Sequence, residues 1–212
     1  QRIISIEDTR ELTLPNTLHW VPLATRLPNP EGKGEVTMLD LVVNSLRMRP
    51  DRIIMGEIRR KAEAEVLFEA MHTGHSVYGT LHANSAEETV TRLTNPPIEM
   101  PRSVLSSLSA ILVQNRNRRT GLRRTLQFAE IEQNEHAKTI IQLDVAKDKL
   151  SQIAAPARLL DTLGLYTGLT ADEIGKDLQE KAKLLKWLLT QNINNVHQIG
   201  LIMSKYYAGK LR

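Results

Sequence analysis

The sequence has 212 residues and contains no cysteine, so disulfides and cysteine-ligated zinc are excluded. Aromatic residues make up only 4% of the chain, which leaves few side chains for stacking on nucleobases. No apolar run approaches the roughly 20 residues that span a bilayer. The first residues are typical of a strand, not of a signal peptide. These absences indicate a protein that buries one core and fits a reducing, cytoplasmic setting.

Charge is unevenly distributed in only one part of the chain. The net charge is +4, and acidic and basic residues alternate along most of the sequence, as on a solvated surface. Residues 116–124 are different because they contain five arginines. Such a cluster can bind phosphates or nucleic acid, or lie at a charged subunit interface. Because no aromatic residue is interleaved with the arginines, the segment does not favour nucleic acid.

Short β-branched runs and longer amphipathic segments alternate up to about residue 114, which predicts βαβ units and a mostly parallel sheet. Buried strands are expected at residues 2–6, 52–55 and 76–82. Helices are expected at residues 36–48 and 61–72, from a capping box of Ser85 and Glu88, and from about residue 102 into the apolar run 110–113. Residues 15–35 are predicted to form a loop and an edge strand, and residues 123–131 and 139–145 a pair of antiparallel edge strands.

The character of the sequence changes after residue 155. Apolar residues at helical spacing then form two stripes, which predict a small helical appendix at residues 156–212 beside an α/β domain at residues 1–155. A buried strand that begins at residue 2 predicts that its neighbouring elements lie upstream, as in a fragment of a longer protein.

Three segments place reactive side chains directly after a predicted buried strand, at the edge of an open α/β sheet where ligands bind. The first contains Glu7 and Asp8, where a carboxylate can orient or deprotonate a water molecule, or can simply cap a turn. The second ends in Glu57 after Gly56, in the pattern of a Walker B strand whose acid holds the water ligands of Mg²⁺. In that segment Arg59 is a candidate for neutralising phosphate charge, or pairs with Glu57 or Glu63.

The third segment has His75 and His82 at the two ends of a predicted strand. A zinc pair is not favoured, because no third ligand lies at the spacing of a metal site. Residues 74–80 have the glycine spacing of a phosphate-binding loop, but Thr80 replaces the lysine and Leu81 the Ser or Thr. They also lead into a strand, whereas a phosphate-binding loop opens a helix. No other segment of the sequence matches that loop.

Together the three segments resemble the type II/type IV secretion ATPase family. Residues 4–12 are similar to its aspartate box, residues 46–59 to its Walker B region and residues 70–86 to its histidine box. The order and intervals also fit, over roughly residues 1–145. Thr9, where many bacterial members have proline, and the helical C-terminal segment are more similar to the archaeal branch.

The resemblance implies a partial RecA-like motor domain that lacks the phosphate-binding (Walker A) unit. Such motors work as six-membered rings of identical subunits at the cytoplasmic face of a membrane, with an inner-membrane platform protein as partner. ATP and Mg²⁺ are the implied ligands, and hydrolysis drives protein export or the assembly of pili or archaella. Because the loop that holds the phosphates is absent, we expect the isolated chain to be inactive.

The resemblance also implies roles for individual residues. Glu7 activates the attacking water, Glu57 holds Mg²⁺ through water, and His82 senses or stabilises the γ-phosphate. The other residues expected around the nucleotide are Asp8, Glu11, Arg47, Arg59, His75 and Thr80. Two other functions remain open, a non-catalytic assembly module in which residues 110–212 dock on neighbours, and a DNA-translocating motor.

Overall fold

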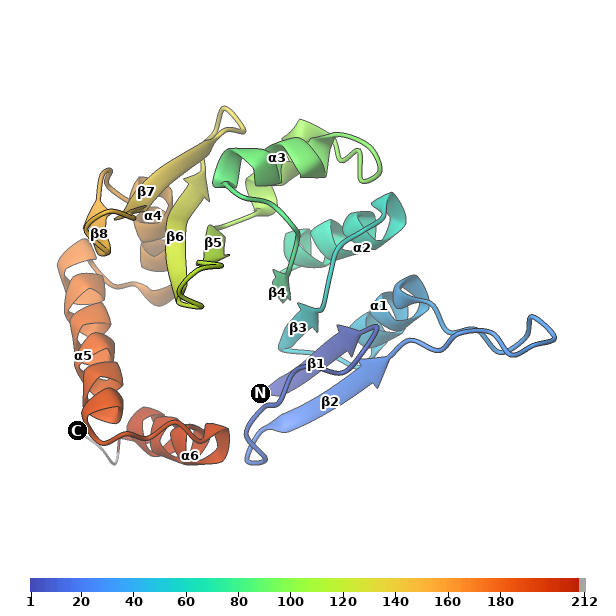
Figure 1. The fold of residues 1–212 in the computed structure, drawn as a ribbon, viewed down its shortest axis with the longest axis horizontal. Helices are drawn as coiled ribbons and strands as arrows, with labels where there is room; N and C mark the ends of the chain where they lie inside the picture. Colours follow the sequence, from blue (N-terminus) through green and yellow to red (C-terminus); the bar gives the residue numbers. More distant parts are fainter. Residues whose placement is uncertain (210–212) are drawn as a thin grey trace. The chain divides into compact units, whose positions relative to one another are not determined.

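The computed structural model describes residues 1–209, which form two compact units (Figure 1). The first unit comprises residues 1–56, residues 75–78 and the segment from residue 169 onward. The second comprises residues 57–74 and 79–168. Each unit is therefore assembled from segments that are not contiguous in the sequence.

The parallel sheet has the strand order β2-β1-β3-β4. Its strands are β1 (Arg2–Glu7), β2 (His19–Ala24), β3 (Arg52–Met55) and β4 (Ser76–Gly79). β1 pairs in parallel with both β2 and β3. Ile4, Ile6 and Ile53 are fully buried, as expected for inner parallel strands that are covered on both faces. The carboxyl ends of β1 and β3 meet, since Ile6 is the register partner of Met55.

Three helices belong to the first unit. Helix α1 (Met38–Arg47) begins at Thr37, which exchanges hydrogen bonds with Asp40 in a capping box. Helices α5 (Ala171–Thr190) and α6 (Val196–Tyr207) form the end of the described chain. The α6 helix packs on the loop before β2, where the Asn16 amide lies 3.3 Å from Nδ1 of His197.

The second unit is built on an antiparallel sheet of strand order β5-β6-β7-β8. Its strands are β5 (Ile111–Arg116), β6 (Arg123–Ile131), β7 (Ala137–Asp144) and β8 (Lys149–Gln152). Its helices are α2 (Lys61–His72), α3 (Ala86–Thr94), the 3-10 helix η1 (Arg102–Ser107) and α4 (Ala157–Thr167). One apolar core joins α2, α3 and η1 to β5 and β6, with Phe68, Val90, Leu105 and Ile131 among its buried members.

The α/β architecture with a mostly parallel sheet and a helical C-terminal segment is confirmed, and several details of the prediction are wrong. Residues 111–116 are a strand, not the continuation of a helix, and η1 is a short 3-10 helix. β6 and β7 are antiparallel as predicted, but they are the inner strands of their sheet, not edge strands. The boundary predicted near residue 155 stays a prediction.

The start of α3 also differs from the predicted capping box. Ser85 is the N-cap and accepts a hydrogen bond from the amide of Glu88 (3.0 Å). The Glu88 carboxylate, however, accepts from the backbone and side-chain nitrogens of Asn84 (2.8 and 2.9 Å). Asn84 thereby fixes the loop between β4 and α3. Within residues 1–209, no helix is both long enough and apolar enough to cross a membrane.

Candidate active site

Glu7 ends β1 as a buried carboxylate with only 3% of its surface exposed. Its Oε1 atom accepts hydrogen bonds from the amides of Glu11 (2.9 Å) and Leu12 (3.0 Å), which hold the carboxylate in place. Its Oε2 atom is buried and has no hydrogen-bond partner in the described part of the chain. A buried oxygen without a partner is uncommon and costly, so this atom is available to a water molecule or a ligand.

Gly56 lies beside Glu7 directly after β3, where an added Cβ atom would be in ordinary van der Waals contact. A Cβ atom at position 56 would lie 3.4 Å from the Cα and Cγ atoms of Glu7 and from the carbonyl oxygen of Ile6. The Gly56 amide donates to that same carbonyl (2.8 Å), so the two strands remain joined up to the site. Gly56 was not among the residues predicted for the site, although it stands in the sequence between a buried strand and Glu57.

The loop after Glu7 is fixed by contacts within the first unit. Asp8 accepts a hydrogen bond from the hydroxyl of Thr25 (3.1 Å), and the Thr25 amide donates to the carbonyl of Glu7 (3.1 Å). The Arg10 guanidinium lies 5.6 Å from the centre of the Trp20 ring, in a cation–π arrangement. β1 and β2 together therefore position the carboxylates of Glu7 and Asp8. The contact between Arg10 and Trp20 was not predicted from the sequence.

Glu57, Arg59 and His82 form a cluster in the second unit. Nη2 of Arg59 lies 2.5 Å from Oε2 of Glu57, and Nε2 of His82 lies 3.4 Å from Oε1. The Glu57 side chain is 23% exposed and that of His82 is 83% exposed, so the imidazole is open to solvent and to ligands. Arg59 thus pairs with Glu57, one of the two partners considered for it, while its backbone amide donates to Glu63 (3.2 Å).

Backbone contacts explain why His82 comes close to Glu57. The amide of Ile58 donates to the carbonyl of Thr80 (3.0 Å), which joins the segment after β3 to the segment after β4. Gly79 is part of this junction, since a Cβ atom there would lie 2.8 Å from Cδ1 of Ile58. The two segments predicted to follow neighbouring strands are therefore brought together.

The pKa of Glu57 is lowered from its ordinary value. The hydrogen bond from Arg59 is the largest cause, partial burial opposes it, and the charges of Arg59 and His82 add to the lowering. Glu57 is therefore ionised at neutral pH. An ionised carboxylate that keeps some solvent contact suits the water-mediated coordination that Mg²⁺ commonly retains in proteins, together with phosphate oxygens.

Two predicted site residues lie away from the carboxyl ends of the strands. Arg47 is exposed at the end of α1, and the chain turns there to begin β3, with the Asp51 amide donating to the Arg2 carbonyl (2.9 Å). Arg47 is therefore at the amino-end side of β1 and β3. His75 precedes the first residue of β4, whereas His82 follows the last. The structure does not bring Arg47 beside Glu7, and it places the two histidines at opposite ends of β4.

Glu11 and Thr80 contribute through their backbones. The Glu11 amide binds Glu7, and the Thr80 carbonyl binds Ile58. Both residues have exposed side chains. Among residues 1–209, no group of three or more histidine, cysteine, aspartate or glutamate side chains is arranged to hold a metal ion by itself.

The sequence matches the model of the family described as type II/IV secretion system protein over residues 1–153. An uncharacterized protein of Methanocaldococcus jannaschii is 35% identical over 192 residues, which cover 87% of this chain and 70% of that protein. The type IV pilus assembly ATPase PilB of Acinetobacter baylyi is 28% identical over 190 residues, 82% of this chain and 31% of PilB. The VirB11 ATPase of the Brucella suis type IV secretion system is 29% identical, with a TM-score of 0.49, over 61% of this chain and 40% of that chain.

The chain thus spans from about a third to about two thirds of the length of these relatives. The family match covers, in one continuous range, the segments that contain Glu7, Glu57 and His82, which are residues 4–12, 46–59 and 70–86. Since that range is well over half of the sequence, the chain belongs to the type II/IV secretion system protein family.

Proposed function

We propose that this chain is the part of an ATP-driven secretion or pilus motor that activates the attacking water. The observation that carries the proposal is the Glu7 carboxylate, which is buried, fixed through Oε1 by two amides, and left without a partner at Oε2. A carboxylate held in this way is suited to accept a hydrogen bond from a water molecule and to receive its proton. In the motor, Glu7 is the general base.

In this proposal Glu57 and His82 act on the phosphates. Glu57 holds the water ligands of Mg²⁺, which supplies charge neutralisation for the phosphates when it is bound. Exposed His82 contacts the terminal phosphate, and Arg59, now paired with Glu57, is available to neutralise negative charge. Asp8, Glu11 and Thr80 remain proposed as residues of the nucleotide site. Arg47 and His75, which lie at the amino-end side of the strands, are not included in this proposal.

The proposal includes an assembly. PilB is a pilus assembly ATPase and VirB11 is an ATPase of a type IV secretion system, and both are similar to this chain. By analogy, we place identical subunits in a ring of six at the cytoplasmic face of a membrane, bound to a membrane platform protein. Protein or pilin, not nucleic acid, is the proposed cargo.

ATP turnover by this motor requires a phosphate-binding loop, and none of the 212 residues forms one by sequence. We therefore propose that the chain is inactive by itself and active when joined to a segment that supplies the loop. The test measures ATP hydrolysis with Mg²⁺ by the chain alone and by a longer protein that carries the loop. Turnover by the chain alone would contradict the requirement for the loop.

In the longer protein, Glu57→Gln is expected to abolish turnover while nucleotide still binds, because Mg²⁺ loses its anionic anchor. Glu65→Gln is the matched control, since Glu65 is exposed on α2. Near-normal turnover by Glu57→Gln, measured beside an unaffected control, would refute the role assigned to Glu57.

A further inference from the structure

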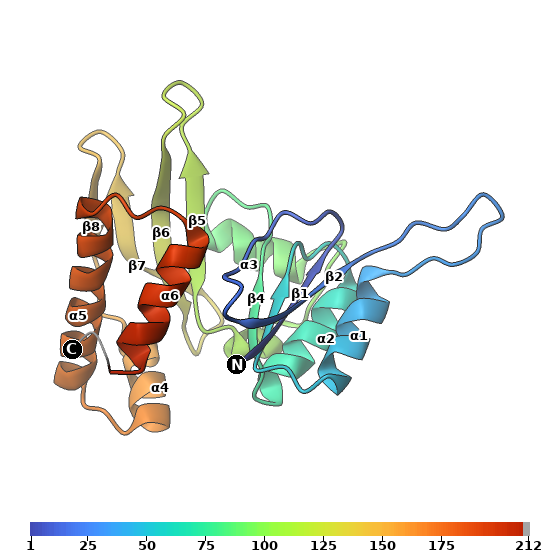
Figure 2. The same ribbon diagram turned by 90° about the horizontal axis from the view of Figure 1, so that it is seen from below.

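Two hairpin turns lie at one end of the antiparallel sheet. The β5–β6 turn and the β7–β8 turn are on the same end because consecutive strands of this sheet run in opposite directions (Figure 2). Arg124 at the base of the first hairpin forms two bonds of 2.8 Å to the carboxylate of Asp148 in the second turn. The two turns therefore form one surface, which we call the hairpin surface and define as residues 116–124 and 144–149.

Positive charge is concentrated on the hairpin surface. Its basic residues are Arg116, Arg118, Arg119, Arg123, Arg124, Lys147 and Lys149, and its acidic residues are Asp144 and Asp148. The resulting charge of +5 exceeds the +4 of the whole chain, so the remaining residues together carry −1. At the opposite end of the same sheet, a pocket is lined by Glu130, Glu132 and Asp161 as well as by Lys138 and Arg158. The charge is thus segregated along the sheet.

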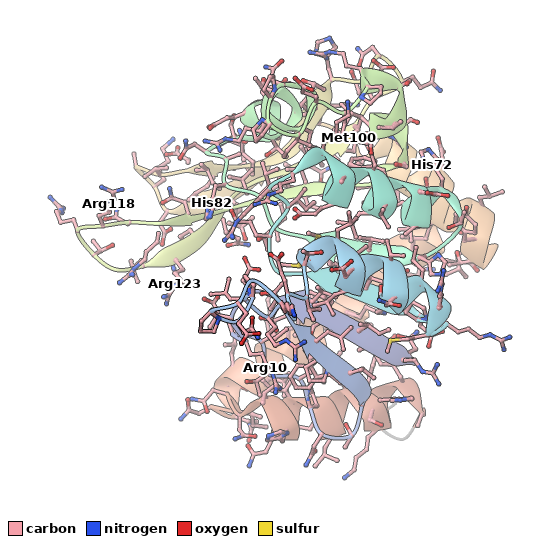
Figure 3. All side chains as sticks on the ribbon, turned by 90° about the vertical axis from the view of Figure 1, so that its right-hand side faces the viewer. Arg10, His72, His82, Met100, Arg118 and Arg123 are labelled. Carbon is pink, nitrogen blue, oxygen red and sulfur yellow. The ribbon has the colours of Figure 1, made fainter. Side chains whose placement is uncertain are left out.

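Most basic side chains of the hairpin surface form no ion pair with another described residue. Of the surface's basic residues, Arg124 pairs with Asp148 and Lys147 with Asp144. The other four arginines and Lys149 form no ion pair within the part of the chain that the structure describes, and all five are exposed. Figure 3 shows Arg118 and Arg123 extending from the first hairpin. Their guanidinium groups are free to bind phosphate oxygens in the bidentate geometry that arginine favours.

Each turn also exposes an apolar side chain. Leu122 is 50% exposed in the first turn and Val145 is 66% exposed in the second. An aliphatic side chain surrounded by basic residues is typical of segments that enter the boundary between lipid headgroups and acyl chains. Surfaces that bind single-stranded nucleic acid have aromatic side chains on which the bases stack, and the hairpin surface has no aromatic residue.

The first turn is held in shape before any ligand binds. Oδ1 of Asn117 accepts from the amides of Arg119 (2.9 Å) and Thr120 (3.1 Å). The Asn117 amide and carbonyl also bond to Leu122 and Gly121 (2.9 and 2.8 Å), and Gly121 has a φ of +71°, which favours glycine. A preformed turn loses little conformational entropy on binding.

We propose that the hairpin surface binds an anionic lipid membrane, with the arginines on lipid phosphates and Leu122 and Val145 at the acyl boundary. The inference depends only on this end of the sheet and not on the nucleotide site. Vesicle binding and ATP hydrolysis can therefore fail independently of each other. Membrane binding by the hairpin surface extends the proposed motor function, because it identifies the part of the chain that faces the lipid.

The test is co-sedimentation of the full chain with vesicles, in the absence of nucleotide. Vesicles of equimolar phosphatidylglycerol and phosphatidylcholine are expected to bind the chain, and vesicles of phosphatidylcholine alone are not. Binding is expected to weaken with added salt, since the Debye length is about 10 Å at 0.1 M ionic strength. The double variant Arg118→Glu/Arg119→Glu is expected to bind at least about tenfold more weakly, and Leu122→Ser more weakly at every salt concentration.

The matched control is Lys183→Glu/Lys186→Glu, which makes the same change of net charge at exposed positions of α5. Circular dichroism checks that all variants keep the fold, as expected for exposed positions. Equal binding to neutral vesicles, or equal losses in the control and in the arginine variant, would overturn the proposal. It would also be overturned if the arginine variant lost affinity for duplex DNA while its vesicle binding did not change.

Discussion

At the scale of single residues, the two oxygens of the Glu7 carboxylate have different surroundings. One accepts from two backbone amides, and the other is buried without a partner among the described residues. The amide contacts position the group, while the second oxygen is the one available for chemistry. Replacement by glutamine separates these two roles, because a glutamine oxygen can still accept from both amides but the side chain cannot take up a proton.

We therefore expect Glu7→Gln, in a protein that carries the phosphate-binding loop, to lower kcat by at least about 100-fold. The free energy of unfolding should change by no more than about 1 kcal/mol. Steady-state ATP hydrolysis measures kcat, and urea unfolding measures the free energy of unfolding. A large loss of stability with normal kcat per folded molecule would show that Glu7 is only a structural residue.

A second residue-scale prediction concerns the pair of Glu57 and Arg59. Arg59→Gln removes the main cause of the lowered pKa, so the pKa of Glu57 should rise toward its ordinary value. Because the folded-state pKa is the lower one, the pair stabilises the fold above the ordinary pKa and loses this contribution as pH falls through the lowered value. The wild type should therefore exceed the variant in stability near pH 7 and match it in strong acid.

A carbon-13 NMR titration of the Glu57 carboxyl group measures this pKa directly. Arg102→Gln is the control, since Arg102 is exposed in η1 of the same unit. An unchanged Glu57 pKa in Arg59→Gln would mean that the hydrogen bond from Arg59 is not maintained in solution. The expected stability difference is small because Arg59 is 57% exposed and its charge is screened by water.

At the scale of elements, two helical glycines have opposite surroundings. An added Cβ at Gly175 in α5 meets no atom within 4 Å, whereas at Gly200 in α6 it would overlap with Cβ and Cγ of Pro15. We expect Gly175→Ala to raise the free energy of unfolding by about 0.5–1 kcal/mol. Gly200→Ala should lower it, because overpacking against a rigid ring costs about 1–3 kcal/mol and exceeds the gain in helix propensity.

Urea unfolding of the two variants side by side tests this prediction. Both make the same chemical change in a helix of the first unit, so their difference isolates the contact with Pro15. A stabilised Gly200→Ala variant would show that α6 does not pack on the loop at Pro15 in solution.

The elements that the sequence predicts well are those with local signals. The bounds of α2 agree with the prediction because its helix formers and its C-terminal Gly74, with a φ of +90°, are contiguous in the sequence. β5 was missed because only Ile111 and Val113 are buried in it, and its strand character comes from pairing with β6. That pairing forms across the turn at residues 117–122, which was not predicted as a hairpin turn.

For the candidate site, the sequence predicted which residues follow each strand but not their contacts. Glu7, Glu57 and His82 were named from their positions after buried strands. The unpartnered oxygen of Glu7 and the close approach of Gly56 depend on how β1 and β3 pair. Arg47 lies shortly before β3 in the sequence, so the parallel pairing of β1 and β3 places it at the amino-end side of both strands.

At the scale of the whole molecule, α4 tests the boundary predicted near residue 155. The carboxylate of Glu130, 2% exposed, accepts from the Leu159 amide (3.1 Å), and Nη1 of Arg158 donates to the Ile131 carbonyl (2.5 Å). A chain that ends at residue 155 would lose both contacts and leave Glu130 beside Lys138, whose nitrogen is 3.9 Å away. A chain that ends at residue 168 would keep them.

We expect the chain ending at residue 155 to be less stable than the chain ending at residue 168 by at least about 1.5–3 kcal/mol, the contribution of one hydrogen bond to a charged group, because it loses the bonds of Glu130 and Arg158. Both truncated chains lack α5 and α6, so their comparison isolates the contribution of α4. Thermal unfolding of the two measures the difference. Equal stabilities would support a domain boundary at residue 155.

The discontinuous make-up of the two units also bears on how such a protein evolves. The chain passes between the units after residues 56, 74, 78 and 168, so neither unit corresponds to a single stretch of gene. A recombination event with one crossover would join segments from two parents inside the first unit, and inside both units when the crossover falls within residues 57–168. Substitutions that adapt β4 to β3 must therefore be inherited along with those in the intervening helix α2, and we expect viable chimeras with relatives to take all segments of the first unit from one parent.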